Sequence, residues 1–289
     1  MPGRLEDLQL LVAVVRYGTL TAAAAHTGTT QSRVSRALKR LEDDVGRVLV
    51  RRSSRQVAPT EAGRRLASEA VHAIERIDAV RSELQTGQAL AGRLRLSTPP
   101  AVGRRVLSPV IQTFCQSNPG IRLDWSLGSR RVDVIAEDVD LAIRFGPLAP
   151  TWQRAIRLMG GRYAVFGSPT LLGERELTAA QLPTWPTIGL HTTHLRDRWP
   201  VYEAGQLQWI NVDPQHWVDD AEALITLTLS GLGLALVPDI LVCDEVAKGH
   251  LRLALPLATA VPFDLYAVLG PHRPLPRAEA LVDHFRRHL

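Results

Sequence analysis

The chain has 289 residues, a hydrophobic content of 45% and a formal net charge of +5. This length and apolar content are sufficient for two domains with separate cores, and they exclude collagen-like, disulfide-rich and largely disordered chains. The basic excess is confined to one end, since residues 1–65 carry 12 Lys and Arg against 6 Asp and Glu, whereas the rest carries 22 against 23. We therefore expect a polyanion to bind the amino-terminal region.

The first 28 residues predict two helices. Apolar side chains at helical spacing indicate an amphipathic first helix. Thr21 is the predicted N-cap of a second, alanine-rich helix over Ala22–Ala25, and Gly28 is expected to adopt the left-handed conformation that ends it. The stripe of the first helix consists of Leu5, Leu8, Leu11, Val12 and Val15.

A third helix and a hairpin follow. Thr30 is the predicted N-cap, and an apolar stripe of helical period lies opposite a polar face. Two short apolar segments, Val48–Val50 and Val57–Ala58, then flank an arginine-rich tip, which favours a hairpin. This order is typical of a winged helix-turn-helix. The stripe contains Val34, Ala37, Leu38, Leu41 and Val45, and the polar face contains Gln31, Ser32, Arg33, Ser35, Arg36, Lys39 and Arg40.

Residues 1 to about 90 resemble the DNA-binding region of the LysR-type transcriptional regulators. The similarity rests on Gly18–Ala25, on Thr30–Glu42 and on the closing Thr60–Gly63. Three positions depart from the family pattern: Arg33 replaces a small residue or proline, Val50 replaces Phe, and Pro59 replaces Leu. The resemblance implies that double-stranded DNA is the partner.

Amide and guanidinium groups can pair with base edges, so base readout is predicted for Gln31, Arg33 and Arg36. The alternative for each polar residue is an ordinary solvated side chain. Phosphate or further DNA contacts are predicted for Thr21, Ser32, Ser35, Lys39, Arg51, Arg52 and Arg55.

A long helix begins after Thr60 and carries a narrow apolar seam. The seam favours a dimerising helix, and the alternative is a helix that lies on its own domain. The predicted domains are the winged helix-turn-helix over 1–62, the linker helix over 63–90 and an effector-binding domain over 91–289. The seam is Leu66, Ala70, Ala73, Ile77, Val80 and Leu84.

From Arg93 onward strands alternate with helices, which predicts an α/β domain. Strands are expected over 94–98, 121–127, 141–145 and 162–166, with helices over 102–116 and 132–137, and a helix–turn–strand unit over 219–238. Gly92–Ser97, Asn118–Leu123, Asp140–Arg144 and Gly231–Pro238 resemble the LysR-type effector-binding region. That resemblance implies two lobes of the periplasmic-binding-protein type, lobe one over 91–163 plus 266–289 and lobe two over 164–265, with crossovers near Tyr163 and Leu265.

Ligands in such sheets bind at the carboxyl ends of strands, so residues at these ends are candidate effector contacts. Thr98 has the alternative of a helix cap, Arg144 of a surface ion pair, and His191 and His194 of ordinary loop residues. Hydroxyl, N–H and guanidinium groups favour a small anion as effector. The candidates are Thr98, Pro99, Pro100, Ser129, Arg130, Arg144, Phe145, Thr192, Thr193, His194 and Asp220.

Several function classes have no residues to support them. Cys115 and Cys243 are expected to be small buried residues in different lobes, and no metal, cofactor or catalytic motif is present, so an enzyme is not predicted. The apolar segment 221–242 is interrupted by Gly231, Gly233 and Pro238, so a membrane span is not expected. The amino terminus lacks a signal core, which predicts a cytoplasmic protein.

The sequence thus predicts an effector-responsive regulator that binds an interrupted palindromic promoter site as a dimer, within a tetramer as the resemblance implies, with RNA polymerase as a further partner. Its ligand would change the spacing of the DNA-binding heads and the DNA bend. One alternative is a solute-binding module with a basic head that binds DNA nonspecifically. The other is an enzyme built on the same two lobes.

Overall fold

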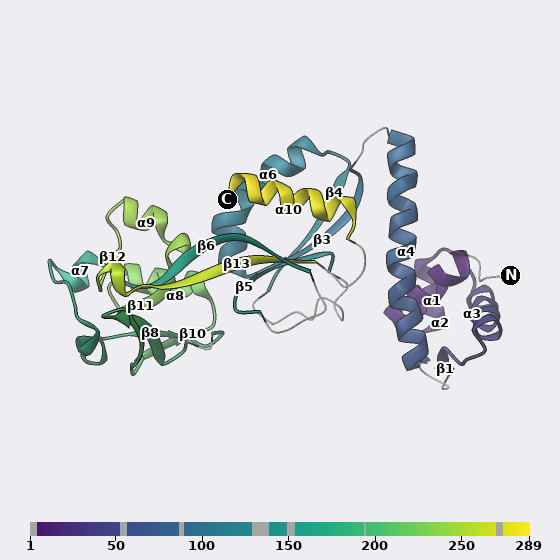
Figure 1. The fold of residues 1–289 in the computed structure, drawn as a ribbon. Coiled ribbons are helices and arrows are strands. Elements are labelled where there is room, and N and C mark those ends of the chain that lie inside the picture. Colours follow the sequence, from purple (N-terminus) through teal and green to yellow (C-terminus); the bar gives the residue numbers. More distant parts are fainter. Residues whose placement is uncertain are drawn as a thin grey trace. The chain divides into compact units, whose positions relative to one another are not determined.

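A computed structural model describes residues 5–52, 57–86, 90–128, 139–148, 154–193, 195–269 and 274–289. The chain divides into two compact units, Met1–Gly92 and Arg93–Leu289. Figure 1 labels the elements of both units.

The first unit is a three-helix core with a two-stranded wing and a long helix. Its helices are α1 (Leu5–Tyr17), α2 (Leu20–His26), α3 (Gln31–Val45) and α4 (Glu61–Thr86), and its antiparallel strands are β1 (Val50–Arg52) and β2 (Val57–Pro59). Buried side chains from α1, α2 and α3 form one core with Leu49, Val50 and Ala67. The winged helix-turn-helix is therefore confirmed.

Local details correct three predictions in this unit. The N-cap of α2 is Thr19, whose hydroxyl accepts from the Ala22 amide, and not Thr21. Val45 is 45% exposed because the last turn of α3 extends beyond the core. The buried face of α1 is centred on Leu10, Leu11 and Val14, so of the predicted stripe Leu11 is fully buried while Leu8, Val12 and Val15 pack against the core partly buried. Thr30 caps α3 and Gly28 has a φ of +63°, as predicted.

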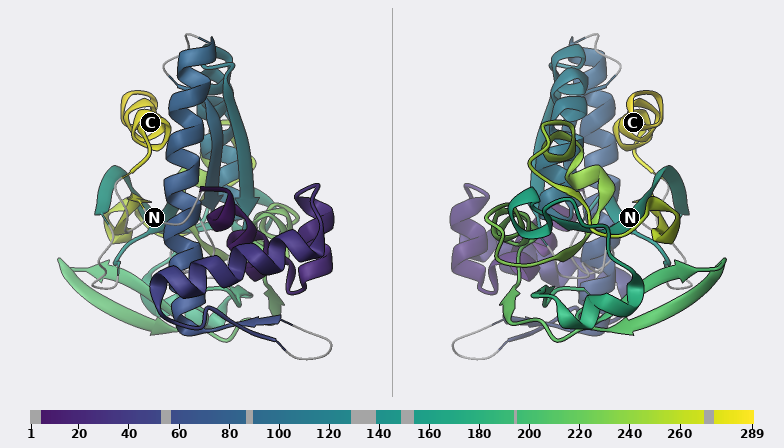
Figure 2. Two further views of the ribbon diagram at one scale, coloured as in Figure 1. Left: turned by 90° about the vertical axis from the view of Figure 1, so that its right-hand side faces the viewer. Right: turned by 90° about the vertical axis from the view of Figure 1, so that its left-hand side faces the viewer.

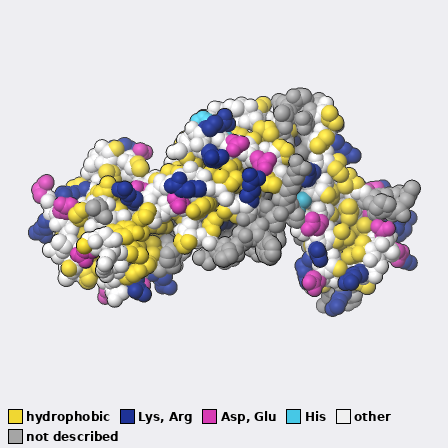
Figure 3. All heavy atoms as spheres, in the orientation of Figure 1, with side chains coloured by type: hydrophobic (Ala, Val, Ile, Leu, Met, Phe, Trp, Pro, Cys, Tyr) yellow, Lys and Arg dark blue, Asp and Glu magenta, His cyan; other side chains and the backbone are white. Residues whose placement is uncertain are grey.

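α4 begins at a capping threonine and leaves part of its seam exposed. The Thr60 hydroxyl accepts from the Gly63 amide at 3.0 Å. Ala70 is buried in the first unit, whereas Ile77, Val80 and Leu84 are 39%, 55% and 81% exposed. Hydrophobic side chains are visible on the surface along α4 (Figure 3). The second half of α4 therefore carries exposed apolar side chains in the single chain.

The second unit is built on a mixed sheet with strand order β11-β6-β13-β5-β3-β4, and β12 also pairs with β6. β3 and β5 are parallel, whereas β13 is antiparallel to both β5 and β6. The strands are β3 (Gly92–Thr98), β4 (Ile121–Leu127), β5 (Leu141–Phe145), β6 (Arg154–Gly167), β11 (Ala235–Pro238), β12 (Arg252–Leu253) and β13 (Val261–Leu269).

Two smaller sheets lie beside this one: β7 (Ile188–Leu190) pairs in parallel with β10 (His216–Val218), and β8 (Arg198–Glu203) pairs with β9 (Gln206–Asn211). The β8–β9 hairpin projects from its surroundings (Figure 2). Its turn uses Ala204 and Gly205 at positive φ.

Helices complete the second unit. The predicted helix over 102–116 begins at Pro100 and contains a π-helical turn, so it consists of α5 (Pro100–Val102), the π turn Gly103–Leu107 and α6 (Ser108–Ser117). α6 lies beside α10 (Figure 1). The predicted helix over 132–137 falls outside the described residues. The remaining helices are α7 (Pro169–Leu172), α8 (Ala221–Leu229), α9 (Cys243–Ala247) and α10 (Pro276–His288), with 3₁₀ turns at Ala179–Thr184, Asp239–Leu241 and Leu257–Thr259.

β6 and β13 pair along most of their length and connect two halves of the unit. We call the half that contains β3, β4, β5, α6 and α10 lobe one, and the half that contains β7–β12, α8 and α9 lobe two. Beyond Tyr163, β6 pairs with β11 and β12 of lobe two, and a register shift occurs at Leu265/Tyr266 of β13. Lobe two has its own core around Trp199, Leu182 and Leu234.

No single helix among the described residues is long and apolar enough to cross a membrane. α1 and α2 satisfy that test only as a pair bent by 120°.

Candidate functional site

The first candidate site is the polar face of α3. Val34, Ala37 and Leu38 are fully buried on the opposite side of the helix. Burial of that side fixes the rotation of α3 about its axis and turns one face outward. The outward residues Gln31, Ser32, Arg33, Arg36 and Lys39 are exposed, and Ser35 is partly buried.

Polar contacts already engage part of this face. The Arg33 guanidinium forms an ion pair with Glu6 of α1 at 2.5 Å, with each side chain about half exposed. Arg36 Nε donates to the carbonyl of Ser32 at 3.4 Å. Arg33 is thus an outward cation whose charge is offset by a neighbouring carboxylate, a feature that the sequence pattern did not predict.

Two carboxylates fix α3 and the wing. The buried Asp7 of α1 accepts two hydrogen bonds from Arg40, which lies on the exposed face as predicted and also connects α3 to α1. Glu42 Oε1 accepts from the amides of Leu49 and Val50 at 2.8 and 3.2 Å, which attaches the start of β1 to α3. Neither carboxylate was predicted: the contacts of Asp7 span 33 positions, and those of Glu42 join a helix to the strand that follows it, 7 and 8 positions away.

The other predicted DNA contacts lie around this face. Thr21 and Arg51 are exposed, on α2 and β1. The Arg52 side chain and the whole of Arg55 lie outside the described residues. A shallow hollow borders the far end of α3 and is lined by the cations Arg36, Lys39 and Arg47 together with the carboxylates Glu42 and Asp43.

The second candidate site is a cavity of about 830 Å³ between lobe one and lobe two. Its volume lies in the range of pockets that hold drug-sized molecules. Apolar side chains form most of the wall, including Phe145, Leu190, Trp199 and Leu241. The polar residues in the wall are Arg144, Tyr163, Thr192, Thr193, Asp219 and Asp220.

The cavity brings together seven of the predicted effector contacts: Pro99, Pro100, Arg144, Phe145, Thr192, Thr193 and Asp220. Ser129, Arg130 and His194 lie outside the described residues. His191 stacks on Trp217 at 4.8 Å and is not among the wall residues.

Thr98 lies elsewhere than predicted. Its side chain is fully buried, and its hydroxyl accepts a hydrogen bond from Trp125 Nε1 at 3.0 Å. It does not line the cavity. The strand end was predicted correctly, but the direction of this side chain depended on Trp125, which lies 27 residues away.

Two polar residues of the cavity wall belong to the large sheet, Arg144 in β5 and Tyr163 in β6. Arg144 donates to the Ser97 carbonyl at 3.2 Å, to the Ser97 hydroxyl at 3.0 Å and to the Ile143 carbonyl at 2.7 Å. Burial raises the pKa of Tyr163 to about 12, so its phenol is neutral at physiological pH. Tyr163 was predicted to lie at a crossover and was not among the predicted site residues.

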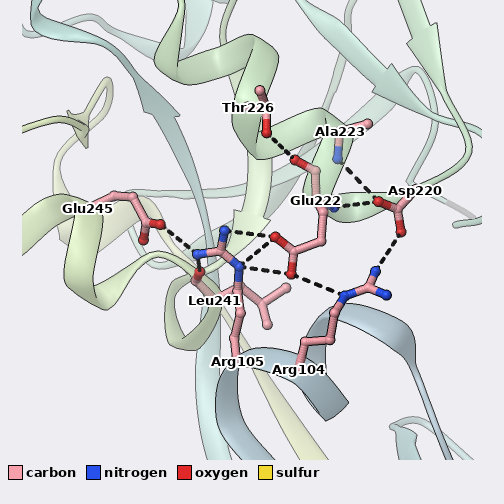
Figure 4. Close-up of polar contacts among 8 residues, drawn as sticks. All are labelled: Arg104, Arg105, Asp220, Glu222, Ala223, Thr226, Leu241 and Glu245. Carbon is pink, nitrogen blue, oxygen red and sulfur yellow. Dashed lines mark hydrogen bonds and ion pairs between the residues drawn. The ribbon is translucent and has the colours of Figure 1, made fainter.

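An ionic cluster beside the cavity joins the two lobes (Figure 4). Arg105 contacts Glu222 and Glu245, and Arg104 contacts Asp220. The hydrogen bond to Glu222 raises the pKa of Arg105. Burial alone would raise the pKa of Glu245, but its hydrogen bond from Arg105 contributes to a net decrease. No local sequence pattern predicted this cluster.

The cysteines differ from their expected burial. Cys243 is exposed and Cys115 is partly buried, and both are free thiols. Among the described residues, no group of three or more His, Cys, Asp or Glu side chains is arranged to hold a metal ion.

Comparisons with known proteins match both units. Residues 5–64 match the family described as bacterial regulatory helix-turn-helix protein, lysR family, and residues 87–289 match the LysR substrate binding domain. The chain is 30% identical to the HTH-type transcriptional regulator CrgA of Neisseria meningitidis serogroup C over 85% of this chain and 83% of that protein. It is 31% identical to an HTH-type transcriptional regulator of Xanthomonas campestris pv. campestris, over 96% and 83%.

Solved structures share the fold over nearly the whole chain. CrgA from Neisseria meningitidis, a LysR-type transcriptional regulator, has a TM-score of 0.61 at 27% identity and covers 97% of this chain and 98% of its own. ArgP from Mycobacterium tuberculosis has a TM-score of 0.72 at 20% identity, over 100% and 97%.

Proposed function

Because the chain belongs to the LysR family of transcriptional regulators, we propose that α3 reads a promoter site and that a molecule bound in the inter-lobe cavity changes this recognition. The chain is a sequence-specific DNA-binding regulator with an effector-binding domain, and not an enzyme. The observation that carries the proposal is the outward polar face of α3, which the core and two carboxylates hold in one orientation.

Individual contacts follow from the chemistry of this face. Gln31 and Arg36 pair with base edges in the major groove, since amide and guanidinium groups can form bidentate contacts there. Arg33 joins them when it exchanges Glu6 for a base or phosphate. The remaining predicted residues contact the sugar-phosphate backbone of the DNA and set the register of α3 in the groove: Thr21, Ser32, Ser35, Lys39, Arg51, Arg52 and Arg55.

Dimerisation through α4 relates two winged helix-turn-helix domains by a two-fold axis, and the DNA site that they bind is then an interrupted palindrome. The exposed Ile77, Val80 and Leu84 support this dimer. A second interface through the effector-binding unit would complete a tetramer, and edge strand β4, with Leu127 40% exposed, is a surface available for it. RNA polymerase is the further partner on DNA, and the cytoplasm is the compartment in which the protein acts.

The effector is largely apolar and makes a few polar contacts. The apolar wall favours such a molecule, with the neutral Tyr163 phenol as a hydrogen-bonding group. The prediction of a small anion has lost part of its basis, because Thr98 is turned away and Arg144 donates to Ser97 and Ile143.

A competition assay tests the proposed function. Labelled DNA from the region upstream of the gene is bound by the purified chain and competed with unlabelled specific or random DNA over a range of salt concentrations. We expect the specific competitor to be at least about a thousandfold more effective. Equal competition by random DNA would contradict site recognition and favour a basic head that binds nonspecifically.

A further inference from the structure

Two adjacent arginines of lobe one extend across the inter-lobe boundary to lobe two. Arg104 and Arg105 lie in the π turn between α5 and α6. Their partners belong to the first turn of α8, to its N-cap, to the turn before α9 and to α9 itself (Figure 4). π turns within α-helices occur frequently at functional sites.

Arg105 forms the tighter of the two connections. Its Nε donates to both carboxylate oxygens of Glu222, at 2.9 and 2.8 Å. Its Nη1 donates to Glu245 Oε1 at 2.6 Å and to the Leu241 carbonyl at 3.0 Å. One guanidinium therefore binds three separate points of lobe two, and its planar arrangement of donors suits such contacts.

Partial burial makes these ion pairs stronger than an exposed pair, because water and salt screen them less. The side chains of Arg105, Glu222 and Glu245 are 26%, 27% and 16% exposed. Glu245 Oε2 is buried without a hydrogen-bond partner. Removal of Arg105 would thus take from Glu245 the guanidinium that it contacts and leave Glu222 with the 3.7 Å contact to Arg104 Nε.

Arg104 forms a looser connection. Its Nη2 lies 3.3 Å from Asp220 Oδ1, and these side chains are 46% and 38% exposed. Asp220 Oδ2 meanwhile accepts from the amides of Glu222 and Ala223 as the N-cap of α8. An exposed contact of this length breaks more easily than the contacts of Arg105.

The packing of Gly103 fixes the turn that carries both arginines. A Cβ at Gly103 would lie 2.5 Å from Thr98 Oγ1 and 2.5 Å from Leu127 Cδ2. The π turn is therefore packed closely against β3 and β4 of lobe one. The Arg105 side chain therefore extends from a closely packed turn of lobe one.

The cluster is adjacent to the cavity wall on both sides. Ala101 and Val102, directly before the π turn, form part of the lobe-one wall. Asp220 and Leu241, which both belong to the cluster, form part of the lobe-two wall. A change in the contacts of Arg105 thus changes the separation of the two walls.

We propose that Arg105 is a positioning residue for the effector, a clamp that sets the separation of the lobes and thereby the width of the cavity. The inference rests on the proposed role of this cavity as the effector site. The short, half-buried contacts of Arg105 set the lobe separation, and the longer, more exposed Arg104–Asp220 contact contributes less to it. A purely structural ion pair would stabilise the fold without controlling this separation.

Pulsed electron paramagnetic resonance measures the inter-lobe distance directly. Spin labels are attached to cysteines introduced at the exposed Gln116 of α6 and Glu176 of lobe two, in a full-length chain with Cys115→Ser and Cys243→Ser. Dilution with unlabelled protein removes distances between chains.

Three variants are compared in this labelled background: Arg105→Ala, Arg105→Lys and Arg154→Ala. The last is the matched control, since it removes an ion pair with Glu279 at 3.5 Å within lobe one. We expect the first two to broaden the distance distribution and shift its maximum, and the control to retain the parental distribution. Lysine should fail to restore it, because one ammonium cannot reproduce the contacts of the guanidinium.

A parental distribution in both Arg105 variants would overturn the proposal. If Arg105→Ala fails to fold, as judged by circular dichroism, Arg105→Lys and Glu222→Gln decide the result. DNA competition with the labelled parent is a separate readout. Loss of site preference in the parent would reject the proposed function, whereas an unchanged distance in the variants would reject the clamp alone.

Discussion

Leu84 of α4 allows a quantitative test of dimerisation through the seam. In the single chain its side chain is 81% exposed. The change Leu84→Gln keeps a long, helix-compatible side chain but removes the apolar surface that a partner helix would cover. It should therefore weaken association without weakening the fold of the protomer.

The expected loss follows from the exposed fraction. Full burial of a leucine side chain contributes about 1.5–3 kcal/mol, and a two-fold seam covers this residue in both protomers. Scaling by the 81% exposure gives a loss of about 2–5 kcal/mol of dimerisation free energy. The dimer dissociation constant should rise by about 30-fold to several thousandfold.

Sedimentation equilibrium of residues 1–92, a compact unit with its own core, measures this constant. Arg76→Gln is the control, because Arg76 is an exposed residue of the same helix outside the predicted seam. In urea unfolding, the free energy of unfolding of the protomer should agree among the parent, Leu84→Gln and Arg76→Gln within about 0.5 kcal/mol. An unchanged dissociation constant for Leu84→Gln would refute the seam.

Three further predictions concern other residues. Gly63→Ala should destabilise the DNA-binding unit by about 1–3 kcal/mol or more in urea unfolding, because its Cβ would lie 1.9 Å from the Leu49 carbonyl oxygen. Glu6→Gln should increase DNA affinity and steepen its salt dependence by up to about one unit of slope, because it frees Arg33 for phosphate. Folding stability should fall as pH rises from 10 towards 12, since the raised pKa of Tyr163, about 12, keeps the folded phenol protonated while the unfolded one ionises. Tyr163→Phe should remove this contribution, as measured by denaturant titration across that pH range.

Each of these has a contrary outcome. Parental stability of Gly63→Ala would mean that the contact between α4 and the wing can relax. Unchanged salt dependence of Glu6→Gln would show that Arg33 does not contact DNA. An identical alkaline loss of stability in Tyr163→Phe would assign that loss to other groups.

Local patterns predicted much of the fold. The strands at 121–127 and 141–145 have the predicted bounds, because each combines an apolar segment with adjacent turn residues. The cap at Thr30 and the left-handed Gly28 were also predicted, since their chemistry depends on three or four neighbouring residues. The N-cap of the short α2 was predicted two residues too late, because Thr19 and Thr21 both satisfy the cap pattern.

Contacts between distant residues were not predictable in the same way. Arg40 looks like an exposed residue in its own helix, but its carboxylate partner Asp7 is 33 positions earlier. The contact between Arg105 and Glu222 spans 117 positions, so no pattern in a single sequence connects them. The cavity residues at strand ends were found from topology, whereas the inward position of Tyr163 required the packed lobes.

The central claim is that the polar face of α3 reads base pairs. A footprinting experiment on the upstream DNA, with Gln31, Arg33 and Arg36 all changed to alanine, tests it most directly, and Arg76→Ala serves as a variant outside this face. We predict that the triple variant loses the protected site while the control keeps it, with both chains folded. Full protection of the same site by the triple variant would contradict the account.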